Sequence, residues 1–247
     1  MLRPAMPVFV GVHGAWSGGW AWWRMHSLFL GKGIRFVMPT CTGLGERAHL
    51  LNPGIDLNTH IEDIVQVIEH EDLSDVVLVG HSYGGMVATG VAARVANRIR
   101  RLIYVDALLP EPGECALDLL PRVQSQGVLE AAQQKGFGWL IPPTPMPEDT
   151  PTRDLDLAAT RRGPQPLHTF TSALPARDHA SRLPATYVYC TRIGLYDSFG
   201  SSAARARGHS GWTFHELNAT HNPHITMPER LVELLTQNIE RSSNPSS

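Results

Sequence analysis

The sequence predicts an α/β fold with a parallel sheet, and three observations lead to this prediction. Short apolar runs bounded by turn residues alternate with stretches of helical periodicity, a pattern typical of β-α-β units. The chain has 247 residues, which is enough for one large domain. Its composition, with 43% hydrophobic and 18% charged residues, is ordinary for a soluble globular protein.

The apolar runs predict six strands, which are expected at residues 8–12, 35–39, 75–80, 101–106, 185–190 and 213–217. Three helices have clear signals. Apolar residues recur at helical spacing over residues 61–68, and Thr59-x-x-Glu62 predicts a capping box at the start of that helix. A helix of small residues is expected at 84–97, and a last helix at 228–241 begins with a proline.

The segment 108–183 interrupts this alternation. It has no clear strand signal, its prolines cluster in IPPTPMPEDTPTRD, and it is too long for a simple loop. We expect an inserted, mainly helical cap here, over a core formed by residues 1–107 and 184–241. Residues 242–247, SSNPSS, are expected to be a disordered tail.

Charge and cysteine content narrow the functional classes. The formal net charge of −2 predicts no attraction to nucleic acid or to an anionic membrane. The three cysteines lie far apart without paired spacing, which favours reduced thiols, and no signal peptide or membrane span is expected. A cytoplasmic protein is therefore the expectation. The 12 histidines are scattered and form no HExxH-like unit, so no metal site is predicted.

The stretch VVLVGHSYGGM contains a candidate nucleophile. Gly80 to Gly84 fit the pattern G-x-S-x-G between an apolar strand and a small-residue helix, which is the context that pattern requires. Ser82 is then expected on a tight, strained turn with its hydroxyl exposed. The alternative is a serine that merely caps the helix.

A serine nucleophile needs a base, and histidines follow the last predicted strand. Ligands of open α/β sheets bind at the carboxyl ends of strands, so the base is expected in a loop after a late strand. His221 comes first after strand 213–217 and is the preferred base, with a capping or surface histidine as the alternative. His224 is expected to be a wall of the pocket.

The first predicted strand runs directly into His13-Gly14-Ala15-Trp16. A glycine at this turn allows backbone N–H groups to point inward. The amides of Ala15 and Tyr83 are therefore candidates for an oxyanion hole. The other expected pocket residues are His13, Gly14, Trp16 and His81, while several of the neighbouring tryptophans are expected to be packing residues.

Three motifs resemble those of the α/β-hydrolase superfamily, namely HGAWSGGWAWW, GHSYGGM and THNPHITMPERLVELL, in the order found in that family. They are most similar to the branch of plant methyl esterases, hydroxynitrile lyases and small bacterial esterases such as pyrethroid hydrolases. The resemblance implies an α/β-hydrolase fold with a six-stranded, mainly parallel sheet. It also implies Ser82 as nucleophile, His221 as base, and the amides of Ala15 and Tyr83 as oxyanion hole.

Two positions depart from that branch. Where its plant members have the acid of the triad, a few residues after a Cys-Thr pair, this chain has Ile193. Asp197 in the same loop and Asp106 at the end of strand 101–106 are the two alternatives, and Asp106 is preferred because the end of a strand is rigid. The lyases carry a lysine directly after the base histidine, whereas this chain has Asn222, which argues against cyanohydrin cleavage.

The sequence thus predicts a carboxylesterase-type serine hydrolase without metal or organic cofactor. Its substrates would be a small hydrophobic ester and water. The sequence leaves open whether the protein forms a homodimer. An apolar roof is expected from the cap, built by Leu108, Leu119, Leu120, Phe137, Trp139 and Leu140. The alternatives are hydrolysis of an amide, carbamate or lactone, a lyase or decarboxylase on the same fold, and a non-catalytic receptor for a small ligand.

Overall fold

The computed structural model describes residues 7–175 and 182–240, and its centre is a six-stranded parallel sheet. The strands are β1 (Val8–Val12), β2 (Phe36–Val37), β3 (Val76–Ser82), β4 (Ile99–Ala107), β7 (Ala185–Cys190) and β8 (Thr213–Leu217). They lie in the order β2-β1-β3-β4-β7-β8 across the sheet. The predicted α/β fold with six parallel strands is confirmed.

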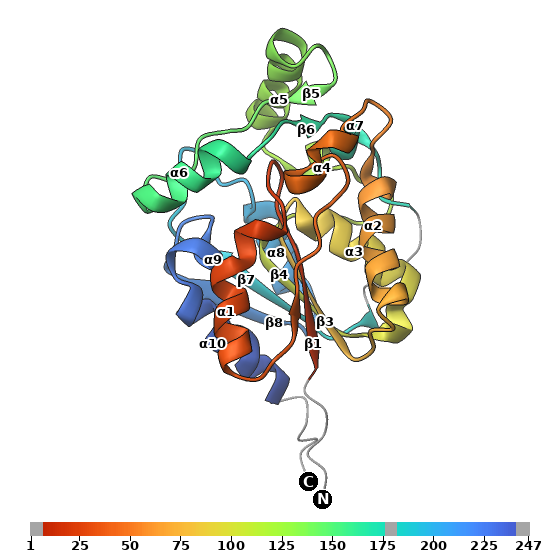
Figure 1. The fold of residues 1–247 in the computed structure, drawn as a ribbon, viewed down its shortest axis with the longest axis vertical. Helices are drawn as coiled ribbons and strands as arrows, with labels where there is room; N and C mark the ends of the chain where they lie inside the picture. Colours follow the sequence, from red (N-terminus) through yellow and green to blue (C-terminus); the bar gives the residue numbers. More distant parts are fainter. Residues whose placement is uncertain (1–6, 176–181, 241–247) are drawn as a thin grey trace, which may run out of the picture.

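Helices cover both faces of the sheet (Figure 1). One face carries α1 (Trp23–Gly31) and α10 (Pro228–Glu240), and the other carries α2 (Leu57–His70), α3 (Gly84–Val95) and α8 (Gly200–Gly208). Successive strand residues point to opposite faces, so Val77 and Val79 pack against α1 and α10 while Val76 and Leu78 pack against α2 and α3. Strands buried on both faces explain why the apolar runs in the sequence are nearly continuous.

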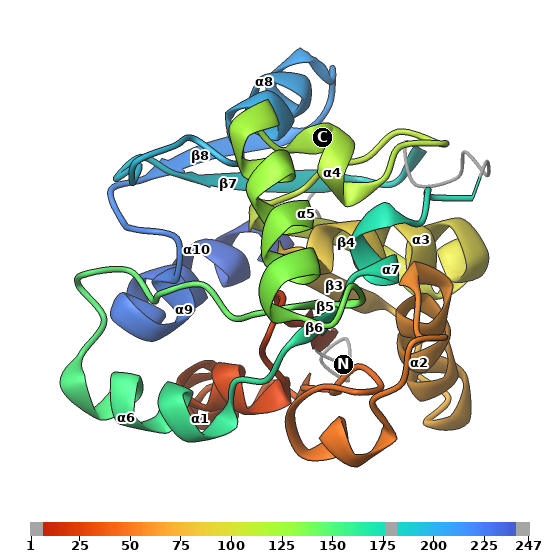
Figure 2. The same cartoon turned by 90° about the horizontal axis from the view of Figure 1, so that it is seen from above.

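The segment between β4 and β7 lies above the carboxyl ends of the strands (Figure 1), and α5 runs across this end of the sheet when the molecule is seen from above (Figure 2). Its elements are α4 (Ala116–Leu119), α5 (Arg122–Lys135), β5 (Leu140–Ile141), α6 (Thr152–Arg161), β6 (Gln165–Pro166) and α7 (His168–Thr171). No strand was expected here, yet β5 and β6 form an antiparallel pair. Strands of two residues carry no periodic signal, which is why the sequence does not predict them. The boundaries of a separate cap stay a prediction.

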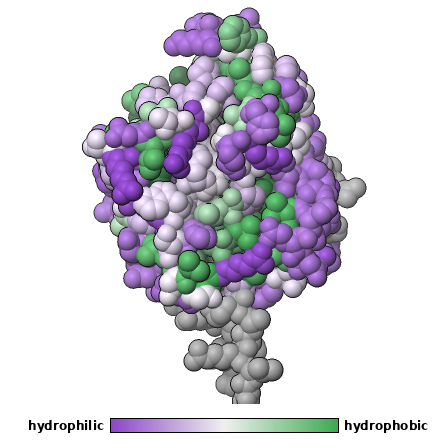
Figure 3. All heavy atoms as spheres, viewed as in Figure 1, coloured by the Kyte–Doolittle hydropathy of each residue, from purple (hydrophilic) through white to green (hydrophobic). Residues whose placement is uncertain are grey.

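Helix α6 exposes mainly polar side chains together with Leu155, and Figure 3 shows mostly hydrophilic atoms over this helix. Its inner side buries Ala158 and Asp154. Asp154 accepts a hydrogen bond from Arg24 of α1 at 2.6 Å, and its carboxylate is only 4% exposed. This ion pair fixes α6 against the helix at the edge of the core.

Two local expectations are corrected. Helix α2 is capped by Asp56 rather than by Thr59, because the Asp56 carboxylate accepts the Thr59 amide at 2.8 Å and the Thr59 hydroxyl accepts the Asp56 amide at 3.3 Å. Glu62 instead pairs with Arg94. Strand β2 spans only two of the five residues expected at 35–39, since it pairs with β1 alone at the edge of the sheet.

The remaining helical turns are η1 (Gly19–Trp22), η2 (Gly45–Leu50), η3 (Ala96–Arg98) and α9 (Pro223–Thr226). In the described part of the chain no helix is both long and apolar enough to cross a membrane. Residue 241 of the predicted last helix and the predicted tail 242–247 lie outside the described residues.

Candidate active site

Ser82 is the last residue of β3 and has a backbone φ of 56°, which L-amino acids rarely adopt. Only Tyr83 separates it from the start of α3 at Gly84. Glycine is needed on both sides of this turn. A Cβ atom at Gly80 would lie 2.7 Å from the carbonyl oxygen of Gly84, and a Cβ atom at Gly84 would lie 2.5 Å from that of Val12. The local sequence therefore brings strand, turn and helix together and holds the serine in a strained conformation at the carboxyl edge of the sheet.

His221 lies in the loop between β8 and α9, and its ring contacts a buried carboxylate. Nδ1 of His221 is 2.7 Å from Oδ2 of Asp106, whose side chain is 6% exposed. The other carboxylate oxygen, Oδ1, accepts the backbone amide of Cys190 at 3.1 Å. Because Nδ1 faces the carboxylate, that nitrogen carries the proton in the neutral ring and Nε2 is left as an acceptor.

Asp197, the other candidate acid, makes different contacts. Its Oδ2 accepts the hydroxyl of Tyr189 at 2.7 Å, and its Oδ1 accepts the backbone amide of Phe199 at 3.3 Å. Asp197 thus supports the start of α8, while Asp106 contacts the histidine. This geometry favours Asp106 for the acid role.

The ring of His221 lies between two other rings. Phe199 stacks on it with ring centroids 4.6 Å apart and planes 8° apart, and His81 lies at the same centroid distance. Nε2 of His81 donates to the backbone carbonyl of His221 at 2.8 Å. The loop that carries His221 is thereby fixed in position from both sides.

Ala15 and Tyr83, the candidate oxyanion-hole residues, follow β1 and β3 and line one cavity together with Ser82. The Tyr83 side chain is fully anchored. Its hydroxyl donates to Nδ1 of His60 at 3.0 Å, Nε2 of His60 donates to the Thr42 carbonyl at 3.0 Å, and Phe170 stacks on the Tyr83 ring. Fixing this side chain also restricts the amide next to Ser82.

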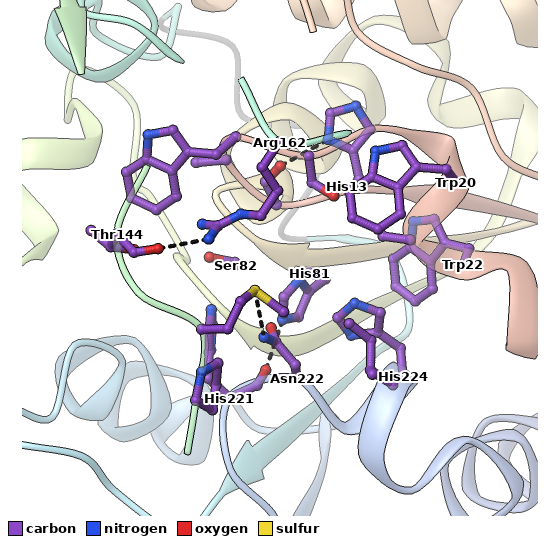
Figure 4. Close-up of a pocket in the computed structure, with 18 of the residues that line it drawn as sticks. His13, Trp20, Trp22, His81, Ser82, Thr144, Arg162, His221, Asn222 and His224 are labelled. Atoms are coloured by element: carbon purple, nitrogen blue, oxygen red, sulfur yellow. Dashed lines mark hydrogen bonds between the residues drawn. The ribbon is translucent and has the colours of Figure 1, made fainter. Parts of the chain in front are cut away.

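Two cavities meet at Ser82 and His221. The larger has a volume of about 1060 Å³ and mainly apolar walls, which include Leu108, Leu120 and Phe170. The smaller has a volume of about 70 Å³ and is walled by rings (Figure 4); its lining includes His13, Gly14, Trp16, Trp20, Trp22, His81, Arg162 and His224. The crevice therefore offers unequal space on the two sides of the serine.

The expected pocket residues fall into two groups. His13, Gly14, Trp16, His81 and His224 do line the small cavity. Trp139 lines neither cavity, because it lies in the turn after α5, where its carbonyl accepts the amide of Leu167 at 2.7 Å. Of the expected apolar roof, Leu108 and Leu120 line the large cavity, whereas Phe137 is 89% exposed.

The pocket histidines other than His221 are held neutral. Burial lowers the pKa of His13 and lowers that of His81 well below its ordinary value. Burial, with a smaller contribution from the His221 charge, lowers the pKa of His224 to about 3. Nδ1 of His13 donates to the Gly14 carbonyl, and its Nε2 accepts the amide of Cys41, which suits one neutral tautomer. Within the described residues, no three His, Cys, Asp or Glu side chains group to hold a metal ion.

Three residues of this region are not predicted from the sequence. Phe199 stacks on His221, His60 anchors Tyr83, and Arg162 enters the small cavity from the end of α6. None of them belongs to a motif, and Arg162 comes from the proline-rich segment, where no periodic signal exists. Only His60 leaves a signal in the sequence. It lies four residues before Ile64, which places it on the apolar side of the helix predicted around residues 61–68.

The chain is similar to known proteins in family profile, in sequence and in fold. The profile described as "Alpha/beta hydrolase family" matches residues 8–234. A carbendazim hydrolyzing esterase from Nocardioides sp. (strain SG-4G) is 40% identical over 240 residues, covering 93% of this chain and 98% of that protein. A pFDCC methylesterase from Arabidopsis thaliana is 27% identical over 208 residues, covering 77% of this chain and 78% of its own length.

Among solved structures, an extracellular α/β-hydrolase from a Paenibacillus species superimposes with a TM-score of 0.80 at 23% identity. The match covers 94% of this chain and 98% of that one. At this level of identity the likeness concerns the fold, which agrees with the six-stranded sheet described above.

Proposed function

The chain belongs to the α/β-hydrolase family, and from this premise we propose that it is a carboxylesterase-type serine hydrolase with Ser82, His221 and Asp106 as its triad. The esterase activity has the support of a curated esterase that matches 93% of the chain and of a curated methylesterase that matches 77% of it. The observation that carries the residue assignment is the contact of 2.7 Å between Nδ1 of His221 and the buried Asp106 carboxylate, in the crevice that also contains Ser82.

The proposed reaction proceeds through an acyl-enzyme. Nε2 of His221 accepts the proton of the Ser82 hydroxyl as its oxygen attacks the ester carbonyl, and the amides of Ala15 and Tyr83 stabilise the resulting oxyanion. His221 then protonates the leaving alkoxide, and the same ring activates the water that releases the acid. Asp106 fixes the tautomer of His221 and stabilises its protonated form.

The two cavities support a substrate with one short and one bulky side. A cavity of about 70 Å³ accepts only a few non-hydrogen atoms, whereas one of about 1060 Å³ accommodates a large apolar group. We therefore propose a hydrophobic ester whose small side enters the ring-walled cavity. No cofactor takes part in the proposed reaction.

Methyl carbamates are a second proposed substrate class, because the relative at 40% identity is a carbendazim hydrolyzing esterase. Carbendazim carries a methyl carbamate on a benzimidazole ring, so it too has one small and one bulky side. Parallel rates on carbendazim and on phenyl butyrate measure the preference between the two classes.

The test is turnover of phenyl butyrate by the wild type, by Ser82→Ala and by Ser27→Ala, an exposed serine of α1 that serves as control. We expect Ser82→Ala to lose about 10⁴-fold or more in kcat, because the covalent step disappears. The control should match the wild type. Near-normal hydrolysis by folded Ser82→Ala would refute the proposed nucleophile.

A further inference from the structure

Arg162 lines the small cavity, and no Lys, Asp or Glu is among the described residues that line it. Its described lining consists of aromatic rings, small residues, prolines, Met146, Asn222 and Ile225, and includes no carboxylate. The pocket histidines His13, His81 and His224 are held neutral by burial, as described above. A guanidinium in these surroundings faces no negative charge from the walls.

The side chain of Arg162 is fixed in this place by two contacts. Its Nη1 donates to the backbone carbonyl of Thr144 at 2.6 Å, and its guanidinium carbon lies 5.6 Å from the centroid of the Trp16 ring. Figure 4 shows the side chain extending into the pocket toward Ser82, with its hydrogen bond to Thr144. The neutral carbonyl occupies only one of the guanidinium nitrogens, so the others remain available to an acceptor.

Two other arginines near the cavity pair with carboxylates, whereas the exposed Arg153 and Arg161 of α6 lie over tryptophan rings. Arg24 pairs with Asp154 at 2.6 Å, and Arg192 pairs with Asp149 at 3.0 Å. Arg162 has no carboxylate partner in the described part of the chain, although it is partly buried and burial lowers its pKa from the ordinary value. A partly buried cation without a counter-charge is costly to maintain. A ligand that brings the counter-charge would offset this cost.

We propose that Arg162 is a specificity-determining residue that binds a carboxylate carried by the substrate, two or three bonds from the ester group, in the small cavity. The inference rests on the proposed function and narrows its substrate class to esters that carry an anionic group on their short side. A carboxylate fits a cavity of about 70 Å³, and the planar guanidinium donates two parallel hydrogen bonds to it. The bulky apolar side of the substrate then occupies the large cavity.

The carboxylate has two sources, the acyl part or the alcohol part of the ester, and two pairs of isosteric substrates distinguish them. Monomethyl succinate is compared with methyl 4-methylpentanoate for the acyl part. For the alcohol part, 3-acetoxypropanoate is compared with 3-methylbutyl acetate. In each pair a carboxylate replaces an isopropyl group of similar size, so the ratio of the two kcat/KM values compares an anionic group with an apolar one, and the change of this ratio in a variant reports on the contribution of the substituted residue. Release of acid is followed by pH-stat titration.

We expect the wild type to favour the anionic member of one pair, and Arg162→Gln to lower that ratio about 10- to 100-fold, mainly through KM. This range corresponds to the loss of a hydrogen bond between charged partners. Arg162→Lys should retain part of the preference, because it keeps the charge without the planar geometry. The control is Arg153→Gln, since Arg153 is an exposed arginine of the same helix that lies over the Trp23 ring, and neither of these residues lines the cavity.

An equal ratio in wild type and Arg162→Gln for both pairs, with turnover of the neutral members intact, would overturn the inference and leave the proposed function standing. Loss of turnover in Ser82→Ala on phenyl butyrate tests the proposed function separately. A wild-type protein that hydrolyses no ester at all would refute both the inference on Arg162 and the proposed function. Circular dichroism of each variant excludes misfolding as the cause of a changed ratio.

Discussion

Asp106 binds two donors at once, the ring nitrogen of His221 and the backbone amide of Cys190. Its backbone φ of 42° is itself unusual for a residue other than glycine and aims the side chain across the end of β7. A buried carboxylate held in this way has one orientation. We therefore expect its removal to affect the reaction far more than the stability of the fold.

At the residue scale, Asp106→Asn is predicted to lower kcat about 10⁴-fold, because an amide cannot stabilise the protonated ring and favours the wrong tautomer. The measurement is kcat on phenyl butyrate at pH 7.5. Asp197→Asn is the matched comparison, and it should stay within about threefold of the wild type, since Asp197 contacts Tyr189 rather than His221. The reverse ranking of the two variants would show that the acid is Asp197.

The sequence identifies residues of the candidate site only where local chemistry leaves a pattern. Ser82 lies in a motif, and His221 follows a recognisable strand, so both are predictable. The sequence favours Asp106 over Asp197 only through its place at the end of a strand, and the fold brings it to a histidine 115 residues away. The assignment of Asp106 stays a prediction until the variants are measured. Arg162 leaves no local pattern, because its position depends on how α6 folds over the sheet.

At the element scale, the contact between α3 and the end of β4 depends on Gly85. A Cβ atom there would lie 2.1 Å from the carbonyl oxygen of Leu108, which is backbone and cannot move aside cheaply. We expect Gly85→Ala to lower the free energy of unfolding by about 1–3 kcal/mol, as overpacking does in other cores. Urea unfolding measures this change.

Gly127 provides the control for this substitution. It lies in α5, is exposed, and has no atom within 4 Å of a Cβ placed on it. Gly127→Ala should raise the free energy of unfolding by about 0.5–1 kcal/mol through helix propensity alone. If both variants shifted stability in the same direction, the close approach of helix and strand would not be the cause.

Elements with long periodic signals are predicted well and short ones are not. The strands and the helices α2, α3 and α10 have apolar patterns that extend over several turns or a whole buried strand. The sequence predicts the start of α2 wrongly, because Thr59 forms only half of a capping box with Asp56 and the predicted cap lies three residues after the observed one. Strands β5 and β6 depend on each other and on the loops around them, which no local pattern records.

At the scale of the whole molecule, buried histidines link stability to pH. Burial lowers the pKa of His60 to about 4 and that of His224 to about 3, against 6.5 for an exposed histidine. Between the folded and the unfolded pKa values, the unfolded chain therefore binds protons at these two histidines and the folded chain does not. Stability is complete above pH 6.5 and is lost as the pH falls from there toward the folded values, at about 1.4 kcal/mol per pH unit for each histidine.

The variant that tests this linkage is His60→Asn, with urea unfolding at pH 7, 6 and 5. It should reduce the slope of the unfolding free energy against pH by up to about 1.4 kcal/mol per unit, whatever its effect at pH 7. Ile64→Val is the control, because it destabilises the same helix by about 1 kcal/mol and removes no titrating group. An unchanged slope in His60→Asn would show that this histidine is charged in the folded protein.

The global arrangement is the level at which the sequence predicts most. Strand number and parallel direction follow from the alternation of strands and helices, and the family resemblance supplies the same sheet. The order of the strands and the cavity sizes follow from long-range packing, so they become visible only in the structure. For the segment 108–183, the prolines predict irregular chain but not its path over the sheet.

The ring of Phe199 that lies flat on His221 has a consequence for spectroscopy. Circulating π-electrons shift protons above an aromatic face to lower frequency, so the ring signals of His221 should move to lower frequency in a proton NMR spectrum, as should those of His209, which stacks on Trp212. The protein thus carries its own reporter, which needs no label. Phe199→Leu should move the His221 signals to higher frequency and leave those of His209 in place, which identifies the His221 signals.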